Sequence, residues 1–141
     1  MSMTEPPAAY RDAPRWAFGD GPELADELLL LVIAGAKRAT CDSLAACQAN
    51  IMPRVGEVSV VLDGAGRPAC AIETTAVDVR RFSEVDAAFA FEEGEGDRSL
   101  ATWRRDHRRY FERQGTFSED MQVVCERFKL LDVFERSEIR P

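Results

Sequence analysis

The pattern of hydrophobic and polar positions predicts a helix near the start of the chain. Pro22 follows Asp20 and Gly21, and acidic residues occupy the next turn. Proline has no amide hydrogen to lose at a helix start, and acids favour the positive end of the helix dipole. Apolar side chains then recur at helical spacing at Leu24, Leu28, Leu31 and Val32. Gly35 is placed to end this helix in a left-handed conformation.

A different periodicity between residues 58 and 79 predicts a β-hairpin. Residues 58–62 read Val-Ser-Val-Val-Leu, and residues 68–79 are rich in Ala, Ile, Thr and Val. The segment Asp63-Gly64-Ala65-Gly66 separates them. Two β-rich runs that flank a glycine-containing turn are typical of paired antiparallel strands.

A short helix is predicted after the hairpin. Ser83 and Asp86 stand three residues apart, like the two ends of a capping box. The residues that follow suit a helix from Val85 to Glu93. Gly94 then predicts its end.

A longer helix and a last strand complete the predicted elements. Asp97 can cap the helix and Gly115 can end it. Its apolar face carries Leu100, Trp103, His107, Tyr110 and Phe111. Residues 121–128 alternate as a strand would and extend toward Phe134. The order of helix, strands, two helices and strand indicates an α+β domain with a small sheet or a partly closed barrel.

Length and charge limit the classes of function. A chain of 141 residues is the size of one domain, and we assign residues 1–15 to a tail and residues 16–141 to the domain. The net charge of -7 opposes a protein that coats duplex nucleic acid. The longest uncharged apolar run, Leu28 to Ala34, is far shorter than the ~20 residues that cross a bilayer. We therefore expect no membrane partner and a cytoplasmic location.

The cysteines do not predict a metal site. The four cysteines form no C-x-x-C pair, and the chain contains one histidine, which is too few ligands for a standard zinc site. Free thiols in the protein interior are the expectation. We predict neither a metal nor another cofactor.

Two clusters could carry chemistry. Lys37 and Thr40 stand three residues apart directly after the first helix, where a rigid element can present side chains to a cleft. An exposed lysine that complements the helix dipole explains Lys37 equally well. A second cluster contains four acids, namely Glu92, Glu93, Glu95 and Asp97. These can form an acid/base or metal cluster or a solvated turn with a helix cap, but they do not fit an EF-hand frame.

Several segments together resemble one known family. They are Phe18-Gly19-Asp20, Leu24-Ala25-Asp26-Glu27-Leu28, Gly35-Ala36-Lys37-Arg38-Ala39-Thr40, Pro53-Arg54-Val55-Gly56-Glu57, Glu93-Gly94-Glu95-Gly96-Asp97, Trp103 with His107, and Val124-Cys125-Glu126-Arg127-Phe128. In this order and spacing the chain resembles the ASCH domain family from about Trp16 to Leu131. The G-x-K-x-x-T and E-G-E-G-D elements make the resemblance specific.

The resemblance implies a PUA-like fold, which is a small β-barrel with flanking helices and a cleft beside the G-x-K-x-x-T segment. Some small ASCH members are amidohydrolases that remove acyl groups from the exocyclic amine of N4-acylated cytosine nucleosides. Others have been proposed as ribonucleases or RNA binders. We therefore expect an amidohydrolase acting on N4-acylated cytosine nucleosides or bases. The alternative is an RNA-binding module with or without ribonuclease activity.

The resemblance also implies a set of site residues. Lys37 and Thr40 match the lysine and threonine of the amidohydrolase members, and Glu93 takes the place of their glutamate, with Glu92 and Glu95 as alternatives. The chain is longer than the small amidohydrolases and carries features of a larger ASCH branch. The residues expected to contact the substrate are Arg38, Glu95, Trp103 and His107.

Amide hydrolysis requires a nucleophile, a proton carrier and a stabilised oxyanion. Thr40 can attack if Lys37 takes its proton, which requires a lowered lysine pKa, with Arg38 as one contributor. A close Glu93 would instead raise the pKa of Lys37, so we expect Glu93 to hold the substrate amine or to protonate the leaving group. Water activated by Glu93 is an equally compatible nucleophile.

Four arginines are the main basic concentration in this acidic chain, namely Arg104, Arg105, Arg108 and Arg109. Such a run is usually a solvated helix face. It is also the best candidate for phosphate contact, and it carries the RNA alternative.

Overall fold

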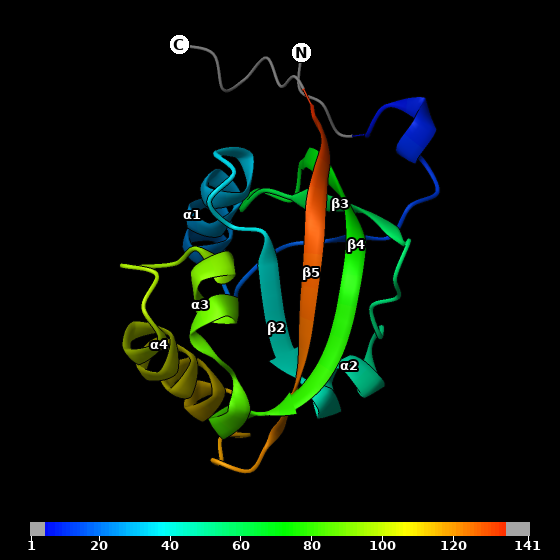
Figure 1. The fold of residues 1–141 in the computed structure, drawn as a ribbon. Coiled ribbons are helices and arrows are strands. Elements are labelled where there is room, and N and C mark those ends of the chain that lie inside the picture. The colour runs from blue at the N-terminus through cyan, green and yellow to red at the C-terminus, as the bar shows by residue number, and fades with distance from the viewer. Residues whose placement is uncertain (1–4, 135–141) are drawn as a thin grey trace.

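A five-stranded sheet with the strand order β1-β3-β4-β5-β2 organises the computed structural model, which describes residues 5–134 (Figure 1). The strands are β1 (Arg15–Trp16), β2 (Ala39–Ser43), β3 (Val58–Leu62), β4 (Pro68–Arg81) and β5 (Gln122–Val133). β1 pairs with β3 in parallel, and the other neighbours are antiparallel. Register shifts bend the long β4–β5 pair. The predicted α+β, barrel-like class is confirmed, with the sheet open rather than closed.

Within the described residues, four α-helices flank the sheet: α1 (Pro22–Ile33), α2 (Leu44–Ala49), α3 (Ala87–Glu93) and α4 (Leu100–Arg113). Short 3-10 turns occur at Ala8–Tyr10 and Phe82–Glu84. Figure 1 shows α3 and α4 on the side of the sheet that ends in β2, with α1 near the start of that strand. β2 is therefore the edge strand of the sheet nearest to α3 and α4.

The predicted first helix and the hairpin are confirmed. α1 begins with Pro22, and Gly35 has a φ of 85°. The amide of Ala36 then donates to the carbonyl of Leu31 at 3.0 Å, which closes the helix end. β3 and β4 pair as expected.

The predicted helix starts require two corrections. The short helix begins at Ala87, and the carboxylate of Asp86 caps it by accepting from the amide of Phe89 at 2.9 Å. Ser83 instead lies in the preceding 3-10 turn. The hydroxyl of Ser99, rather than Asp97, caps α4. The carboxylate of Asp97 accepts from the amide of Ser99 and so holds the capping residue in place.

The N-terminal segment, assigned to a tail, packs on the sheet over its described part. The ring of Tyr10 lies 5.5 Å from that of Phe134. Arg15 and Trp16 then form β1 beside β3. Residues 1–4 lie outside the described part of the chain.

Two apolar clusters flank the place where Lys37 is buried. One joins α1 to the sheet through Phe18, Leu28, Leu29, Val32, Ile72 and Phe128. The other joins α3 and α4 to the sheet through Phe82, Phe89, Trp103, Phe111 and Val123. Lys37 follows the end of α1, and its side chain lies between the two clusters. It is therefore shielded from solvent.

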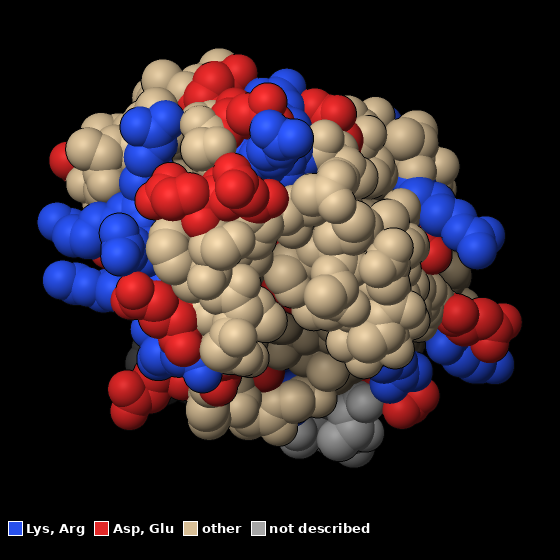
Figure 2. All heavy atoms as spheres, turned by 90° about the horizontal axis from the view of Figure 1, so that it is seen from below, with Lys and Arg blue, Asp and Glu red and all other residues tan. Residues whose placement is uncertain are grey.

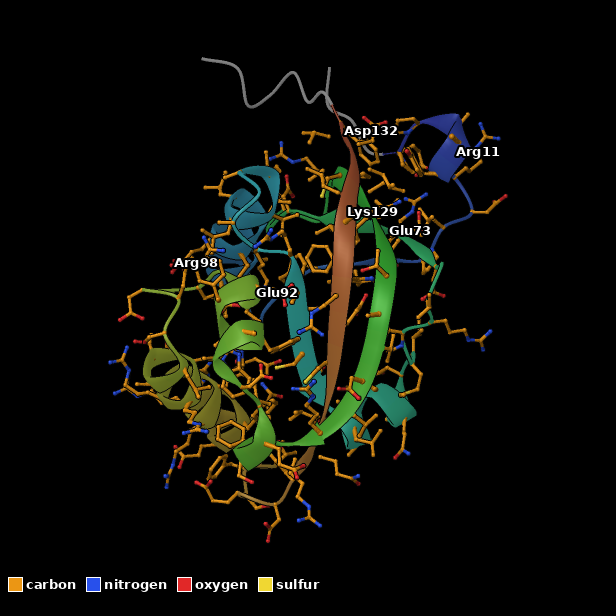
Figure 3. All side chains as sticks on the ribbon, in the orientation of Figure 1. Arg11, Glu73, Glu92, Arg98, Lys129 and Asp132 are labelled. Carbon is orange, nitrogen blue, oxygen red and sulfur yellow. The ribbon has the colours of Figure 1, made fainter. Side chains whose placement is uncertain are left out.

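The end of α3 clamps the loop that carries Lys37. The amide of Arg38 donates to the carbonyl of Glu92 at 2.7 Å. The guanidinium of Arg98 donates to the carbonyls of Phe91 and Ala36 at 3.0 and 3.1 Å, and Figure 3 shows Arg98 beside this loop. Gly94 has a φ of 73°, and a Cβ there would overlap the carbonyl of Ala36. A glycine is therefore required for the two segments to approach.

We predict that Gly94→Ala destabilises the fold more than Gly35→Ala. Both positions have positive φ, but a Cβ at Gly35 meets nothing within 4 Å. The control should cost about 1 kcal/mol of unfolding free energy from backbone strain, and Gly94→Ala should cost at least about 2 kcal/mol more because the loops must separate. Urea unfolding measures both. Equal losses in the two variants would contradict the clamp.

Candidate active site

Lys37 is the buried centre of a polar cluster. Its side chain is 1% exposed. Nζ donates to Oε1 of Glu93 at 2.9 Å, to Oε2 of Glu95 at 2.6 Å and to the carbonyl of Ala39 at 2.9 Å. These contacts use the three ammonium hydrogens, and the backbone carbonyl of Glu93 lies at a longer 3.4 Å. Burial lowers the pKa of Lys37, but the two carboxylates outweigh it and hold the pKa above its ordinary value.

Glu93 is the fixed anion of the cluster. Its side chain is 1% exposed, and Oε2 accepts from the indole of Trp103 at 2.8 Å. The same oxygen lies 3.3 Å from Nε2 of His107. Burial raises the pKa of Glu93, but Lys37 and His107 outweigh it, so the pKa lies well below its usual range.

His107 faces an acceptor at each ring nitrogen. Nδ1 lies 2.9 Å from the carbonyl oxygen of Trp103, and Nε2 faces Glu93. The ring stacks on the indole of Trp103 at 4.3 Å. Burial lowers the pKa of His107, but Glu93 and the hydrogen bonds outweigh it and raise the pKa. This geometry favours the doubly protonated imidazolium.

Glu95 contacts the same ammonium in a different environment. Its side chain is 23% exposed. Burial raises the pKa of Glu95, Lys37 only partly offsets this, and the charge of Glu93 adds to the rise. Two glutamates on one lysine therefore have pKa shifts in opposite directions, a pattern typical of a site that separates a fixed charge from a proton carrier.

The cluster opens into a cleft with two lobes. The first lobe, about 380 Å³, is lined by Glu93, Glu95 and His107 together with residues of α1 and α4. The second lobe, about 290 Å³, lies on the side of α2. Both lobes share Phe18, Gly19, Thr40, Cys41 and Tyr110. Figure 2 views the end of the molecule that carries α2 and α4, and its surface is hollowed near the centre.

A family model described as ASCH domain matches residues 14–132. The chain belongs to the ASCH domain family. No curated protein matches it. The solved structures do provide relatives.

This ASCH domain is similar to an ASCH domain from Lactobacillus crispatus JV V101, with 36% identity, a TM-score of 0.79, and coverage of 85% of this chain and 80% of that one. Protein EF3133 from Enterococcus faecalis V583 is 32% identical, with a TM-score of 0.78 and coverage of 90% and 81%. Hypothetical protein PH0355 is 16% identical with a TM-score of 0.56 over 83% of this chain and 99% of that one, and it shares the fold. The PUA-like fold expected from the resemblance is therefore confirmed.

Within this ASCH domain, the structure distinguishes the three candidate glutamates. Glu93 and Glu95 contact Lys37, whereas Glu92 accepts from Arg127 at 2.7 Å. Figure 3 shows Glu92 directed toward the sheet, over β2. Glu92 therefore belongs to an ion pair outside the cluster.

Thr40 and Arg38 occupy different environments. Thr40 lines both lobes, and within residues 5–134 its hydroxyl has no hydrogen bond to Lys37 or Glu93. The side chain of Arg38 is exposed and lines neither lobe. It does not lower the pKa of Lys37, which is raised instead because the carboxylates surround the ammonium. Trp103 is buried behind Glu93, and His107 reaches the first lobe.

Sequence reasoning missed Cys41 as a cleft residue, because β2 was not predicted. Ligand atoms of Cys41, Glu93 and His107 lie within 4.8 Å of one another. Burial and the charge of Glu93 raise the pKa of the Cys41 thiol well above its ordinary value. A metal held by these three residues would take Nε2 of His107 and an oxygen of Glu93, and it would replace the contact that those two groups make with each other.

The arginines of α4 divide between two surfaces. Arg104, Arg105 and Arg108 line a separate shallow hollow with Phe82, Ser83 and Glu119. Arg109 lines the first lobe. In Figure 2, blue side chains gather at the left of the face, on the side of α4. Within residues 5–134, no helix is long and apolar enough to span a bilayer.

We predict that His107 titrates above its ordinary pKa of 6.5 in the folded protein. It is the chain's single histidine, so one imidazole signal in the NMR spectrum of untagged protein reports it. A raised folded-state pKa means that its stabilisation is complete below about pH 6.5 and is lost as the pH rises through the folded value.

The matched variant is Glu93→Gln, which removes the facing charge. Its His107 pKa should fall below that of the wild-type protein. A wild-type pKa below 6.5 would contradict the charged imidazolium.

Proposed function

We propose that this ASCH domain is an amidohydrolase that removes acyl groups from the exocyclic amine of N4-acylated cytosine nucleosides or bases. The observation that carries the proposal is the Lys37 ammonium, held between Glu93 and Glu95 at a cleft lined by Thr40. The match of Lys37 and Thr40 to the motif of the amidohydrolase members supports it. The opposite pKa shifts of the two glutamates support it further.

Glu95 is the proton carrier in this proposal. Its partial exposure gives it access to a water molecule in the first lobe, and its raised pKa brings it closer to neutrality. Glu95 takes a proton from the water as the oxygen attacks the acyl carbonyl. It then gives that proton to the departing exocyclic amine, and the products are a carboxylic acid and the cytosine amine.

Lys37 acts as a cation rather than a base. Its raised pKa keeps the ammonium charged, and the charge stabilises Glu95 as a carboxylate and the negative charge that develops on the substrate. Glu93 stays ionised and holds Lys37 in place. This cationic role differs from the sequence-based hypothesis that Lys37 is the base that takes the proton of Thr40.

The free edge of β2 offers an oxyanion donor. The carbonyl of Arg38 accepts from the amide of Phe128, so the strand alternation turns the backbone groups of residues 40 and 42 toward β5, whereas the amide of Arg38 donates to the carbonyl of Glu92. Residues 39 and 41 then face the free edge, in agreement with the bond from Lys37 to the carbonyl of Ala39. The amide of Cys41 thereby points away from β5 at the junction of the two lobes.

Water is the nucleophile that this geometry favours. Within the described residues the Thr40 hydroxyl has no hydrogen bond to a base that could take its proton. Lys37, the base considered for it, donates all its hydrogens elsewhere. Thr40 therefore orients the water or the substrate carbonyl.

The cleft suits a small neutral pyrimidine. Its lobes are of the size that binds small ligands. Phe18 and Tyr110 line the junction between them and offer aromatic surface to a planar base. Carboxylates line both lobes and accept hydrogen bonds from amines. In the second lobe no lysine or arginine accompanies them among the described residues, so that lobe repels phosphate.

RNA binding remains the second candidate and would use another surface. The hollow beside Arg104, Arg105 and Arg108 is exposed and cationic. Acidic neighbours reduce its charge, since Arg105 pairs with Asp106 and Arg108 with Glu112. A polyanion bound there would not need the Lys37 cluster.

An ultraviolet assay with N4-acetylcytidine tests the proposal. We expect Glu95→Gln to lower kcat/KM about a hundredfold or more, because the proton carrier is lost. Glu92→Gln is the control, since Glu92 contacts Arg127 and not Lys37, and it should remain near wild type. Wild-type kcat/KM should rise with pH along an acidic limb whose pKa exceeds the ordinary glutamate value of 4.5.

Two outcomes would contradict the proposal. One is a wild-type protein that turns over no acylated cytosine. The other is a Glu95→Gln variant that retains the activity of the Glu92→Gln control.

A further inference from the structure

The second lobe has a polar lining that the hydrolytic step does not use. Thr40 of β2 stands opposite Glu126 of β5, so their side chains share one face of the sheet, and Asp42 lies two residues along that face. Asp42, Glu57 and Glu126 all line the lobe. Burial raises the pKa of both Asp42 and Glu126, which indicates that their carboxylates are partly removed from water.

These carboxylates keep unused acceptor capacity. One oxygen of Asp42 accepts from the amide of Ser43 at 2.8 Å. One oxygen of Glu126 accepts from the hydroxyl of Thr74 at 2.6 Å. Within residues 5–134, no lysine or arginine forms an ion pair with Asp42, Glu57 or Glu126. The lobe therefore presents acceptors without a neutralising cation.

Ser59 provides an independent sign of a ligand. It is 4% exposed and lines the second lobe. Among the described residues its hydroxyl has no hydrogen-bond partner. Buried hydroxyl groups in folded proteins are almost always satisfied. A polar group entering the lobe would complete this one.

We propose that the second lobe binds the ribose of the nucleoside through its hydroxyl groups, with Ser59, Asp42 and Glu126 as the residues that select it. This inference rests on the proposed function, because it places the sugar beside the same hydrolytic cluster. Sugar hydroxyls are uncharged hydrogen-bond donors. They can donate to the carboxylates of this lobe and pair with its unpartnered hydroxyl. The acyl group has no donor and suits this lobe poorly.

The arrangement of the cleft supports this placement. Both lobes meet at Thr40 and Cys41, so a base at the junction directs its exocyclic amide into the first lobe and its sugar into the second. Trp16 and Ile51 add apolar surface against which the carbon face of a sugar can pack. A 5′-phosphate would meet the same carboxylates and be repelled. The lobe therefore selects the nucleoside over both the free base and the phosphorylated nucleoside.

The test compares three substrates with one acyl group: N4-acetylcytosine, N4-acetylcytidine and N4-acetylcytidine 5′-monophosphate. We expect kcat/KM for the nucleoside to exceed that for each of the others about tenfold or more. Ser59→Ala and Glu126→Gln should reduce the preference for nucleoside over base about tenfold while leaving turnover of the base unchanged. In Glu126→Gln the glutamine side chain keeps an oxygen that can accept the hydrogen bond from the Thr74 hydroxyl.

Matched controls are Ser83→Ala and Glu73→Gln, which line neither lobe. Both should keep the wild-type preference. Circular dichroism and thermal unfolding confirm that each variant is folded. Calorimetric binding of cytidine and cytosine provides a readout that does not depend on turnover.

The outcomes separate this inference from the proposed function. Equal kcat/KM for base and nucleoside, unchanged by Ser59→Ala and Glu126→Gln, would overturn the ribose lobe and leave the amidohydrolase intact. No turnover of any substrate would overturn the amidohydrolase. Ribose binding in the second lobe would still be supported in that case if cytidine binds more tightly than cytosine and Ser59→Ala weakens cytidine binding. A preference for the 5′-monophosphate would overturn it.

Discussion

The burial of one positive charge governs the architecture of this ASCH domain. Removing an ammonium from water costs several kcal/mol unless hydrogen-bonded anions surround it. Lys37 is 1% exposed and meets this requirement through Glu93, Glu95 and the carbonyl of Ala39. Glu93 in turn needs Trp103 and His107, so α4 must dock where its indole and imidazole reach that carboxylate. The close approach of Gly94 to Ala36 allows the loop that carries Lys37 to reach the end of α3 and its glutamate.

The edge strand β2 connects this buried charge to a usable cleft. Its inner edge pairs with β5, and its outer edge carries the carbonyl that binds Lys37. Thr40 and Cys41 stand where the lobes meet. The Lys37 cluster lies in one lobe and the unneutralised carboxylates lie in the other. One short strand thereby places two chemically different surfaces within reach of one small ligand.

Periodicity and turn chemistry predicted the elements whose signals are local. Pro22 and Gly35 bounded α1, and Gly94 ended α3, because helix termini depend on neighbouring residues. β2 was missed, since Ala39–Ser43 is short and has little β-branched or aromatic content, and it becomes a strand through pairing with β5, at positions eighty or more residues away. The motif indicated Lys37 and Glu93. The sequence left open whether the pKa of Lys37 is raised or lowered and which of the glutamates contact it, because both depend on how closely two distant loops approach.

The charge state of Lys37 is the central claim, and NMR of the side-chain Nζ tests it directly. The chain has two lysines, Lys37 and Lys129, so Lys129→Arg leaves one signal. We expect a slowly exchanging ammonium that stays protonated beyond the ordinary lysine pKa of 10.5. Its stabilising contribution is then present below that value and is lost only as the pH rises through the folded-state pKa. A Lys37 signal that titrates near neutral pH would contradict the account and restore the lysine as a general base.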